Sequence, residues 1–284
     1  MRATTDGYPG DGARAGQAPR RERRLEDIRQ YLLRNGSATI DELVSLTDVS
    51  RMTIHRDLDV LSHRGQLHRT RGGASVERTL LFESNIEYRL SQARAAKQAI
   101  ARTAADLIEP GQVILLDDST TSHALLLQLS PDLPVTIATN SLPSLTVASS
   151  RPNTQLIALG GDYQPNYQAF FGLVTESALA SIHADVLVAS ASALRGRRLF
   201  HQSQFVISAR RAMLASSERS LLLVDSSKIG ATALYGYGDV EDYDLLITDD
   251  GAPQGAVEGL ADLDVTLVVA RVDRGDERHH PSTD

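Results

Sequence analysis

Seven short apolar runs, spread over residues 113–269, constrain the fold more than any other feature of the sequence. Segments with helical or loop character separate most of them. Strands that are apolar on both faces lie in a parallel sheet with helices covering each side. We therefore predict a doubly wound, largely parallel α/β domain over residues 97–272. The predicted strands are residues 113–116, 135–138, 156–159, 186–189, 221–224, 245–247 and 265–269.

The N-terminal part of the chain follows a different pattern, typical of a small helical domain. Leucine and isoleucine at helical spacing predict a first helix, and Thr39 with Glu42 predicts a capping box that opens a second. Ser50 is a favourable N-cap for a third helix. The glycine-bounded, arginine-bearing segment 65–74 predicts a hairpin. Residues 20–76 are therefore expected to form a winged helix-turn-helix.

The third helix has one apolar and one polar edge. At about 100° per residue, the apolar edge is formed by Ile54, Leu58 and Leu61. The first residues on the outer edge of a recognition helix enter the major groove, so we expect Met52, Thr53 and Arg56 near base edges. This outer edge continues to His63, a further predicted contact. Phosphate contacts, which position the protein without specifying sequence, are expected from Arg51, Arg69 and Arg71.

The charge of the chain is unevenly distributed. The net charge is −7, yet residues 20–76 contain 11 arginines against 8 acidic residues, while the remainder holds 18 basic and 28 acidic residues. A basic module on an acidic body is typical of an electrostatic footprint confined to one domain. The alternative is that these arginines form a solvated helix face. The combination of capped helix, turn and basic wing favours DNA binding.

Composition excludes several other classes of protein. The chain has no cysteine, which removes disulfides and cysteine-based zinc sites and fits a reducing cytoplasm. No apolar run approaches the roughly 20 residues that cross a bilayer, and the histidines lack metal-ligand spacing. We expect a cytoplasmic protein without metal, cofactor or membrane partner. Residues 1–19 and 273–284 are predicted as disordered tails and residues 77–96 as a linker.

Polar segments follow four of the predicted strands: residues 117–121, 139–141, 160–161 and 225–228. Each alone is ordinary turn chemistry, but ligands of open α/β sheets bind at the carboxyl ends of the strands. Together the segments predict a small-molecule cleft. No catalytic set emerges, because neither Ser119 nor Ser122 has an evident histidine–aspartate relay. The residues predicted to bind the ligand are Asp117, Ser119, Thr120, Thr121, Asn140, Gly160, Gly161 and Lys228.

Two motifs carry a family resemblance. The N-terminal module, with Thr53-Ile-His-Arg-Asp-Leu58 and Gly72-Gly-Ala74, resembles the DeoR/GlpR family of bacterial transcriptional regulators. The second domain is similar to the sensor domain of that family, which looks like ribose-phosphate isomerase and binds phosphorylated sugars. Its matching segments are residues 117–121, 139–141, 159–161 and 225–228, so the resemblance spans about residues 20–272.

The sequence departs from the family pattern in the predicted cleft. Asp118 and Ser119 stand where the family has a small residue and a glycine. Losing the glycine hinders close approach to a phosphate, and a second carboxylate repels one. Residues 195–198 contain three arginines in a segment that is usually neutral. Two interpretations of these arginines stay open: they restore affinity for an anion, or they form a solvated loop.

The resemblance implies a transcriptional regulator, and we expect a repressor of carbohydrate metabolism genes. It would bind an operator as a homodimer or homotetramer and be released by a small, sugar-phosphate-like effector. Two alternatives remain open from the sequence. One is an isomerase-like enzyme with an added DNA module, and the other is an adaptor whose winged helix binds protein. The identity of the effector, the operator sequence and the direction of regulation are not determined by the sequence.

Overall fold

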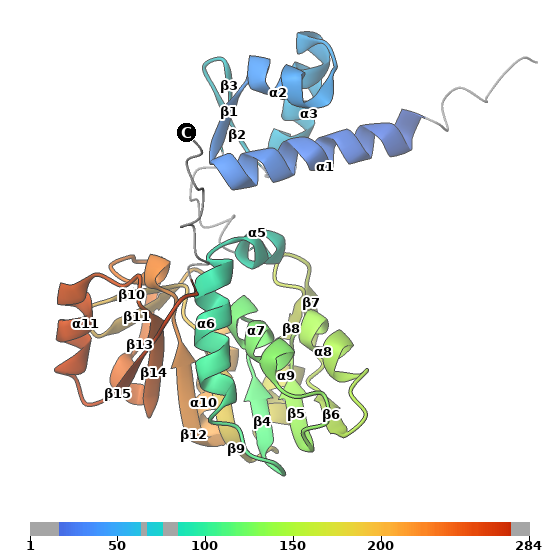
Figure 1. Ribbon diagram of the computed structural model, residues 1–284. Coiled ribbons are helices and arrows are strands. Elements are labelled where there is room, and N and C mark those ends of the chain that lie inside the picture. Colours follow the sequence, from blue (N-terminus) through green and yellow to red (C-terminus); the bar gives the residue numbers. More distant parts are fainter. Residues whose placement is uncertain (1–16, 64–66, 76–84, 274–284) are drawn as a thin grey trace, which may run out of the picture. The chain divides into compact units, whose positions relative to one another are not determined.

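The computed structural model describes residues 17–63, 67–75 and 85–273 of the chain (Figure 1). The chain divides into two compact units, residues 1–82 and 83–284. None of the helices described is long and apolar enough to cross a membrane.

The first unit has the predicted three helices and a small antiparallel sheet of strand order β1-β3-β2. The apolar edge of α3 is buried as expected, together with Leu25 and Leu43. Helix α1 begins at Gln17, so the prediction of a tail to residue 19 was too long by three residues. The elements are α1 (Gln17–Asn35), β1 (Ser37–Thr39), α2 (Ile40–Thr47), α3 (Arg51–His63), β2 (His68–Thr70) and β3 (Gly73–Ser75).

Strand β1 was not predicted, because it is short and carries no apolar pattern. Its last residue, Thr39, is also the N-cap of α2. The Thr39 side chain accepts from the Glu42 N–H, and the Glu42 carboxylate accepts from the Thr39 N–H at 2.7 Å. The predicted capping box is thus confirmed. At Gly73, a Cβ atom would lie 2.0 Å from the Ala38 carbonyl oxygen. Only glycine allows β3 to approach β1 this closely.

The second unit contains a seven-stranded sheet of order β15-β14-β12-β9-β4-β5-β6, with every pair parallel. All seven predicted strands are present, with shifts at their ends. The doubly wound parallel sheet is therefore confirmed. The strands are β4 (Val113–Leu116), β5 (Val135–Thr139), β6 (Thr154–Ala158), β9 (Ala184–Ala189), β12 (Ser217–Leu223), β14 (Leu245–Asp249) and β15 (Thr266–Ala270).

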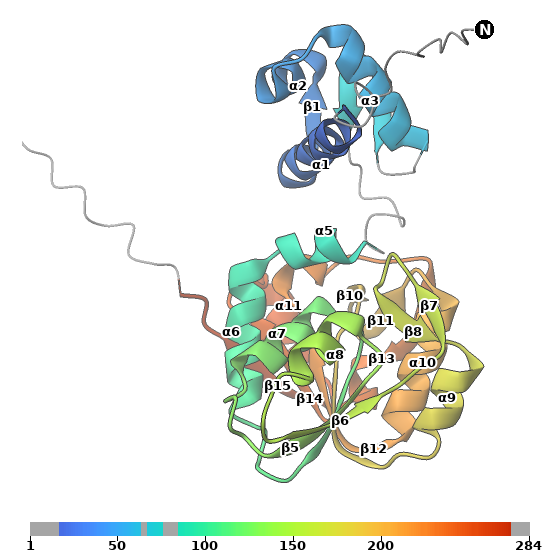
Figure 2. The ribbon, with the colours of Figure 1, turned by 90° about the vertical axis from the view of Figure 1, so that its right-hand side faces the viewer.

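Helices cover both faces of this sheet. Along β4, Ile114 and Leu116 pack in one core with α6, α7 and α8, whereas Leu115 faces the core formed with α9, α10 and α11. Figure 2 shows α6, α7 and α8 on one side of the sheet and α9 and α10 on the other. The helices are α6 (Arg94–Ala105), α7 (Thr120–Gln128), α8 (Leu142–Ala148), α9 (Leu173–Leu179), α10 (Gln204–Ala215) and α11 (Gln254–Ala261).

Several short elements were not predicted, because segments of three to six residues are too brief to show a helical or strand pattern. The predicted linker, residues 77–96, includes α5 and the start of α6. Ile86 is buried, and its N–H donates to the Asn166 carbonyl at 2.9 Å. From Asn85 onward the chain is therefore part of the second unit. The added elements are α5 (Ile86–Ser91), β7 (Asp162–Gln164), β8 (Ala169–Phe171), β10 (Ala193–Arg195), β11 (Arg198–His201) and β13 (Tyr235–Asp239).

Candidate functional sites

The outer face of α3 presents exposed side chains. Ser50 caps the helix as predicted, because its Oγ accepts from the Thr53 N–H at 3.3 Å. Met52 is 62% exposed, and Arg56 is exposed without an ion pair to any described residue. Arg51 is exposed as well and forms an ion pair with Asp41 at 3.0 Å. The start of this helix therefore offers apolar and cationic groups to a partner in solvent.

The wing is attached to α3 by one of its arginines. Arg69 Nη1 donates to the His55 carbonyl and to Asp59 Oδ1, both at 3.0 Å. Arg71 is exposed, and His63 is exposed with its Nδ1 bonded to the Asp59 carbonyl at 2.7 Å. Of the two wing arginines, Arg69 holds the wing against the helix and Arg71 extends into solvent.

One residue of α3 that sequence reasoning missed is Asp57, which is buried. Its carboxylate accepts from Arg24 at 2.6 and 3.3 Å and lies 3.5 Å from Arg21 Nε. Asp57 thereby fixes α3 to α1. It follows Arg56 in sequence but is rotated from it by about 100° around the helix axis, so that Asp57 is buried while Arg56 is exposed. The helical angle alone separates the two roles.

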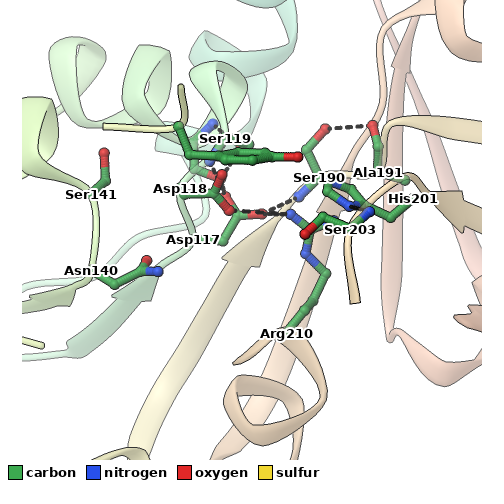
Figure 3. A network of polar contacts seen from close by, with 12 residues as sticks. Asp117, Asp118, Ser119, Asn140, Ser141, Ser190, Ala191, His201, Ser203 and Arg210 are labelled. Carbon is green, nitrogen blue, oxygen red and sulfur yellow. Dashed lines mark hydrogen bonds and ion pairs between the residues drawn. The ribbon is translucent and has the colours of Figure 1, made fainter. Parts of the chain in front are cut away.

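The order of strands places a topological switch point between β4 and β9, at the position of the predicted cleft. The chain runs from β4 outward through β5 and β6, then returns to β9 on the other side of β4. Such a switch point is where ligands of open α/β sheets bind. Asp117 follows β4 and Ser190 follows β9. Figure 3 shows the side chains that meet there, with Arg210 reaching from α10 toward Asp117.

Asp117 is fully buried and accepts four hydrogen bonds. Its Oδ1 accepts from the Ser119 N–H at 3.0 Å and from Ser122 Oγ at 2.7 Å. Its Oδ2 accepts from the Ser190 N–H and from Arg210 Nη2, both at 2.9 Å. Both oxygens are thus occupied within the protein. Asp117 joins β4, α7, β9 and α10 at the base of the cleft.

The neighbouring Asp118 has a carboxylate oxygen to which no described residue donates, so that it is free to accept a hydrogen bond. It is buried, and its carboxylate lies 3.6 Å from Arg210 Nη2 and 3.7 Å from Arg89 Nη2. Its Oδ2 receives no hydrogen bond from the described residues. Burial raises the pKa of Asp118, against the opposite effect of Arg89. Two arginines therefore face the carboxylate that was expected to repel a phosphate.

His201 is a neutral donor in the same cluster. Its Nδ1 accepts from the Ser203 N–H at 3.0 Å, which places the ring proton on Nε2. Burial first, then the charges of Arg210 and Arg89, hold the pKa of His201 well below its ordinary value. The ring centroid lies 6.2 Å from that of Tyr167. His201 therefore stays uncharged at neutral pH.

Of the other predicted ligand residues, Lys228 contacts this cluster, and Asn140 follows the neighbouring strand β5. Lys228 Nζ donates to Ser190 Oγ at 3.1 Å and lies 3.6 Å from Asp225. Asn140 Nδ2 donates to the Phe170 carbonyl at 2.8 Å, while its Oδ1 has no partner among the described residues. Ser119 caps α7, whose first residues Thr120 and Thr121 are buried.

Of the two predicted glycines, Gly161 is required by close packing, and Gly160 supplies a carbonyl acceptor. A Cβ atom at Gly161 would lie 2.4 Å from the Phe171 carbonyl oxygen and 2.3 Å from Thr175 Oγ1. The Gly160 carbonyl accepts from Thr175 Oγ1 at 2.6 Å. These contacts fix the end of β6 against β8 and α9, and they occupy the backbone that was predicted to approach a ligand.

Two of the three arginines of residues 195–198 form ion pairs with local acidic groups. Arg197 forms ion pairs with Asp239 and Glu241, each at 3.1 Å, and Arg198 lies 3.4 Å from Asp239. Both arginines are exposed. Of the two open interpretations, the geometry favours the solvated loop.

Sequence reasoning missed most of the cations around the cleft. Arg89 and Arg210 lie on helices distant in sequence from the strand ends, and no motif marks them. Lys97 is buried on α6, and its Nζ donates to the Arg89 carbonyl. Burial, followed by the charge of Lys228, lowers the pKa of Lys97 to about 7. Among the described residues, no cluster of three or more histidine or acidic side chains is placed to hold a metal ion.

Comparison with known proteins adds the family to this geometry. Residues 24–79 match the DeoR-like helix-turn-helix domain, and residues 92–250 match the DeoR C terminal sensor domain. The chain belongs to the DeoR family. Both matches are to regulator domains, so the chain is a DNA-binding regulator rather than an enzyme.

Relatives of known name align over most of their length. The L-fucose operon activator of Haemophilus influenzae is 34% identical over 87% of this chain and 99% of its own. The HTH-type transcriptional repressor GlcR of Bacillus subtilis is 30% identical over 89% and 98%. Ribose 5-phosphate isomerase A of Methanocaldococcus jannaschii overlaps with a TM-score of 0.34 at 18% identity, over 47% of this chain and 53% of its own. That overlap is too slight to bear on function.

Proposed function

We propose that this regulator binds operator DNA through the outer face of α3 and the wing. The observation that carries the proposal is the exposed start of α3. There, Met52 and Arg56 extend from a capped helix whose opposite edge is buried. Arg56 would read a base edge, with Thr53 and Met52 beside it. Arg51, Arg71 and His63 would contact the phosphate backbone or the groove edge, and Arg69 would do so while holding the wing.

We further propose that the cleft of the second unit binds a small phosphorylated sugar or a related anionic metabolite. Arg89, Arg210 and Lys228 supply positive charge there, and Asp118 and Asn140 supply unfilled acceptors for hydroxyl groups. A sugar phosphate combines an anionic group with several hydroxyls, which suits both sets. The relatives named for an L-fucose operon and for a lactose phosphotransferase system support a role in carbohydrate metabolism.

The regulator is proposed to act as a repressor in the cytoplasm, as a homodimer or homotetramer. Two-fold symmetry would pair half-sites about 34 Å, or a multiple, apart. Effector and DNA are then linked: an effector that prefers the weakly binding conformation weakens DNA binding by the same factor that DNA weakens effector binding. Relatives are named both as activators and as repressors, so repression, as opposed to activation, is part of the proposal.

Fluorescence anisotropy tests the DNA-binding proposal. The full-length protein is titrated onto a labelled duplex from the region upstream of its own gene, with a scrambled duplex as control. We expect binding at least about a thousandfold tighter than to the control. It should weaken with salt by about 0.9 log units per log unit of salt for each phosphate contacted. No binding to either duplex at low salt would contradict the proposal and favour a protein partner.

A further inference from the structure

Helix α5 connects the cleft to the rest of the chain. It is the first described element after residues 76–84, which join the two units in sequence. Asn85 caps it, accepting from the Glu87 N–H at 2.9 Å, and Ile86 anchors it to the turn between β7 and β8. The helix also lies against α7, the helix that begins at the cleft. Helix α5 is thus the described helix of the second unit nearest in sequence to the first unit, and it also packs against a helix of the cleft.

Arg89, on this helix, reaches the cleft without forming hydrogen bonds there. Its Nη2 lies 3.7 Å from Asp118 Oδ2, and its Cζ lies 5.4 Å from the ring centroid of Tyr167. The Nε and Nη2 atoms of Arg89 are buried and donate no hydrogen bond to a described residue. Asp118 Oδ2 accepts none from a described residue. Charge and ring contacts hold the guanidinium in place, while its directional donors stay unused. Buried polar groups of this kind call for a partner.

The main chain of Arg89 is tied to the same region. Its carbonyl accepts from Lys97 Nζ, and the charges of Lys228 and Asp225 act on Lys97. The Arg89 side chain thus lies beside Asp118 in the loop after β4, and its carbonyl holds a lysine that interacts electrostatically with the loop after β12. These are two of the strand ends that form the cleft.

We infer that Arg89 is the residue through which a ligand in the cleft controls helix α5, and with it the connection to the DNA-binding unit. An anionic group beside Asp118 would accept two charge-assisted hydrogen bonds from the Nε–Nη2 edge of the guanidinium. Those bonds exist only while α5 keeps its present position. The ligand therefore has a different affinity for two positions of α5, which is what a population shift requires. This inference rests on the proposed function.

The first test measures amide hydrogen exchange of α5 in the full-length protein. Millimolar inorganic phosphate is the probe, and sodium chloride of equal ionic strength is the reference. Phosphate should slow exchange at residues 88–92 by about fivefold or more in the wild type. Arg89→Met should abolish the slowing, and Arg89→Lys should reduce it, because lysine keeps the charge but not the planar fork. Arg102→Met removes an exposed arginine of α6 whose only ion pair with a described residue is to Asp273, and it should respond as the wild type does.

The second test measures DNA affinity on a duplex selected from a random pool by the wild-type protein. Phosphate should change the affinity of the wild type and of Arg102→Met, but not that of Arg89→Met. Slowed exchange in Arg89→Met, or no slowing in the wild type, overturns the inference and leaves the proposed DNA binding intact. An equal DNA response in wild type and Arg89→Met also overturns it. Failure of the wild type to select any duplex overturns the proposed function and the inference together.

Discussion

The two units use charged side chains in opposite ways. In the first unit, called the DNA-binding unit, Arg56 and Arg71 extend into solvent and have no ion pair among the described residues. In the second unit, called the sensor unit because it contains the sensor domain, Asp117, Asp118 and Arg210 are buried. Arg210 Nη2 lies 2.9 Å from Asp117 and 3.6 Å from Asp118. An exposed arginine keeps its charge for a polyanion in solution. In a buried cluster, opposite charges neutralise one another through ion pairs, and only a few polar atoms remain free to bind a small ligand.

Exposed and buried charged side chains differ in how much the stability of the fold depends on them. Exposed arginines contribute little to stability, because water replaces their contacts. Buried ones are part of the scaffold, since removing one partner leaves the other charged and desolvated.

Asp117→Asn should destabilise the sensor unit by about 3–5 kcal/mol. Asparagine cannot accept all four hydrogen bonds that Asp117 receives, and Arg210 loses its closest counter-charge. Urea unfolding of the full-length protein, followed by circular dichroism, measures the change. The matched control is Asp239→Asn, a half-buried residue whose ion-pair partners Arg197 and Arg198 are exposed, with an expected cost below about 1 kcal/mol. Equal costs for the two variants would contradict the comparison.

Asp57→Asn tests a buried charge inside the DNA-binding unit, where Arg56 and Arg71 are exposed. The variant loses charge-assisted hydrogen bonds from Arg24, at a cost of about 1.5–3 kcal/mol. The loss should be smaller than that of Asp117→Asn, because Arg24 and Arg21 retain access to water. Hydrogen exchange of the α3 amides reports it. If α3 exchanged as slowly as in the wild type, Asp57 would not be what fixes α3 to α1.

Arg56→Ala should weaken operator binding by about 1–3 kcal/mol and relax sequence preference at one position. Its free energy of unfolding should stay within about 0.5 kcal/mol of the wild type. Arg71→Ala is the matched variant: it should weaken binding equally on all sequences and reduce the salt slope by about 1. Anisotropy titrations over a range of salt concentrations separate the two. Unchanged operator binding by Arg56→Ala would mean that another part of α3 enters the groove.

Lys97 should make the stability of the sensor unit depend on pH. Burial and Lys228, with smaller effects from Arg89 and Arg94 against that of Asp225, lower its pKa from 10.5 to about 7. Between these values the unfolded chain binds a proton that the folded chain does not. The free energy of unfolding therefore rises with pH across this window, by at most about 1.4 kcal/mol per pH unit. Below it, the lysine is protonated in both states, so its destabilising effect is complete.

Urea titrations at several pH values, compared with Lys97→Met, isolate this contribution. The methionine variant should lack the rise between pH 7 and 10.5, the two pKa values of Lys97. Arg102→Met on the same helix should keep it, since arginine does not titrate in this range. A rise of equal slope in Lys97→Met would assign the effect to another group.

The sequence by itself determined the parts of this protein that depend on local order. Apolar runs predicted all seven strands of the parallel sheet, and the Thr39–Glu42 capping box and the Ser50 cap appeared where predicted. The outward direction of Arg56 followed from helical angle, since neighbours in a helix have fixed angular relations. The family motifs are local as well, and they identified the regulator.

Only the tertiary structure decided which charges surround the cleft. Arg89, His201 and Arg210 come from α5, β11 and α10, and each is distant in sequence from Asp117 and Asp118. The sequence also gave no sign that Asp117 is fully bonded, or that Gly161 serves packing against Phe171. The physical reason is that Coulomb energy and burial depend on distance in space. The order of strands, which brings β9 beside β4, sets those distances.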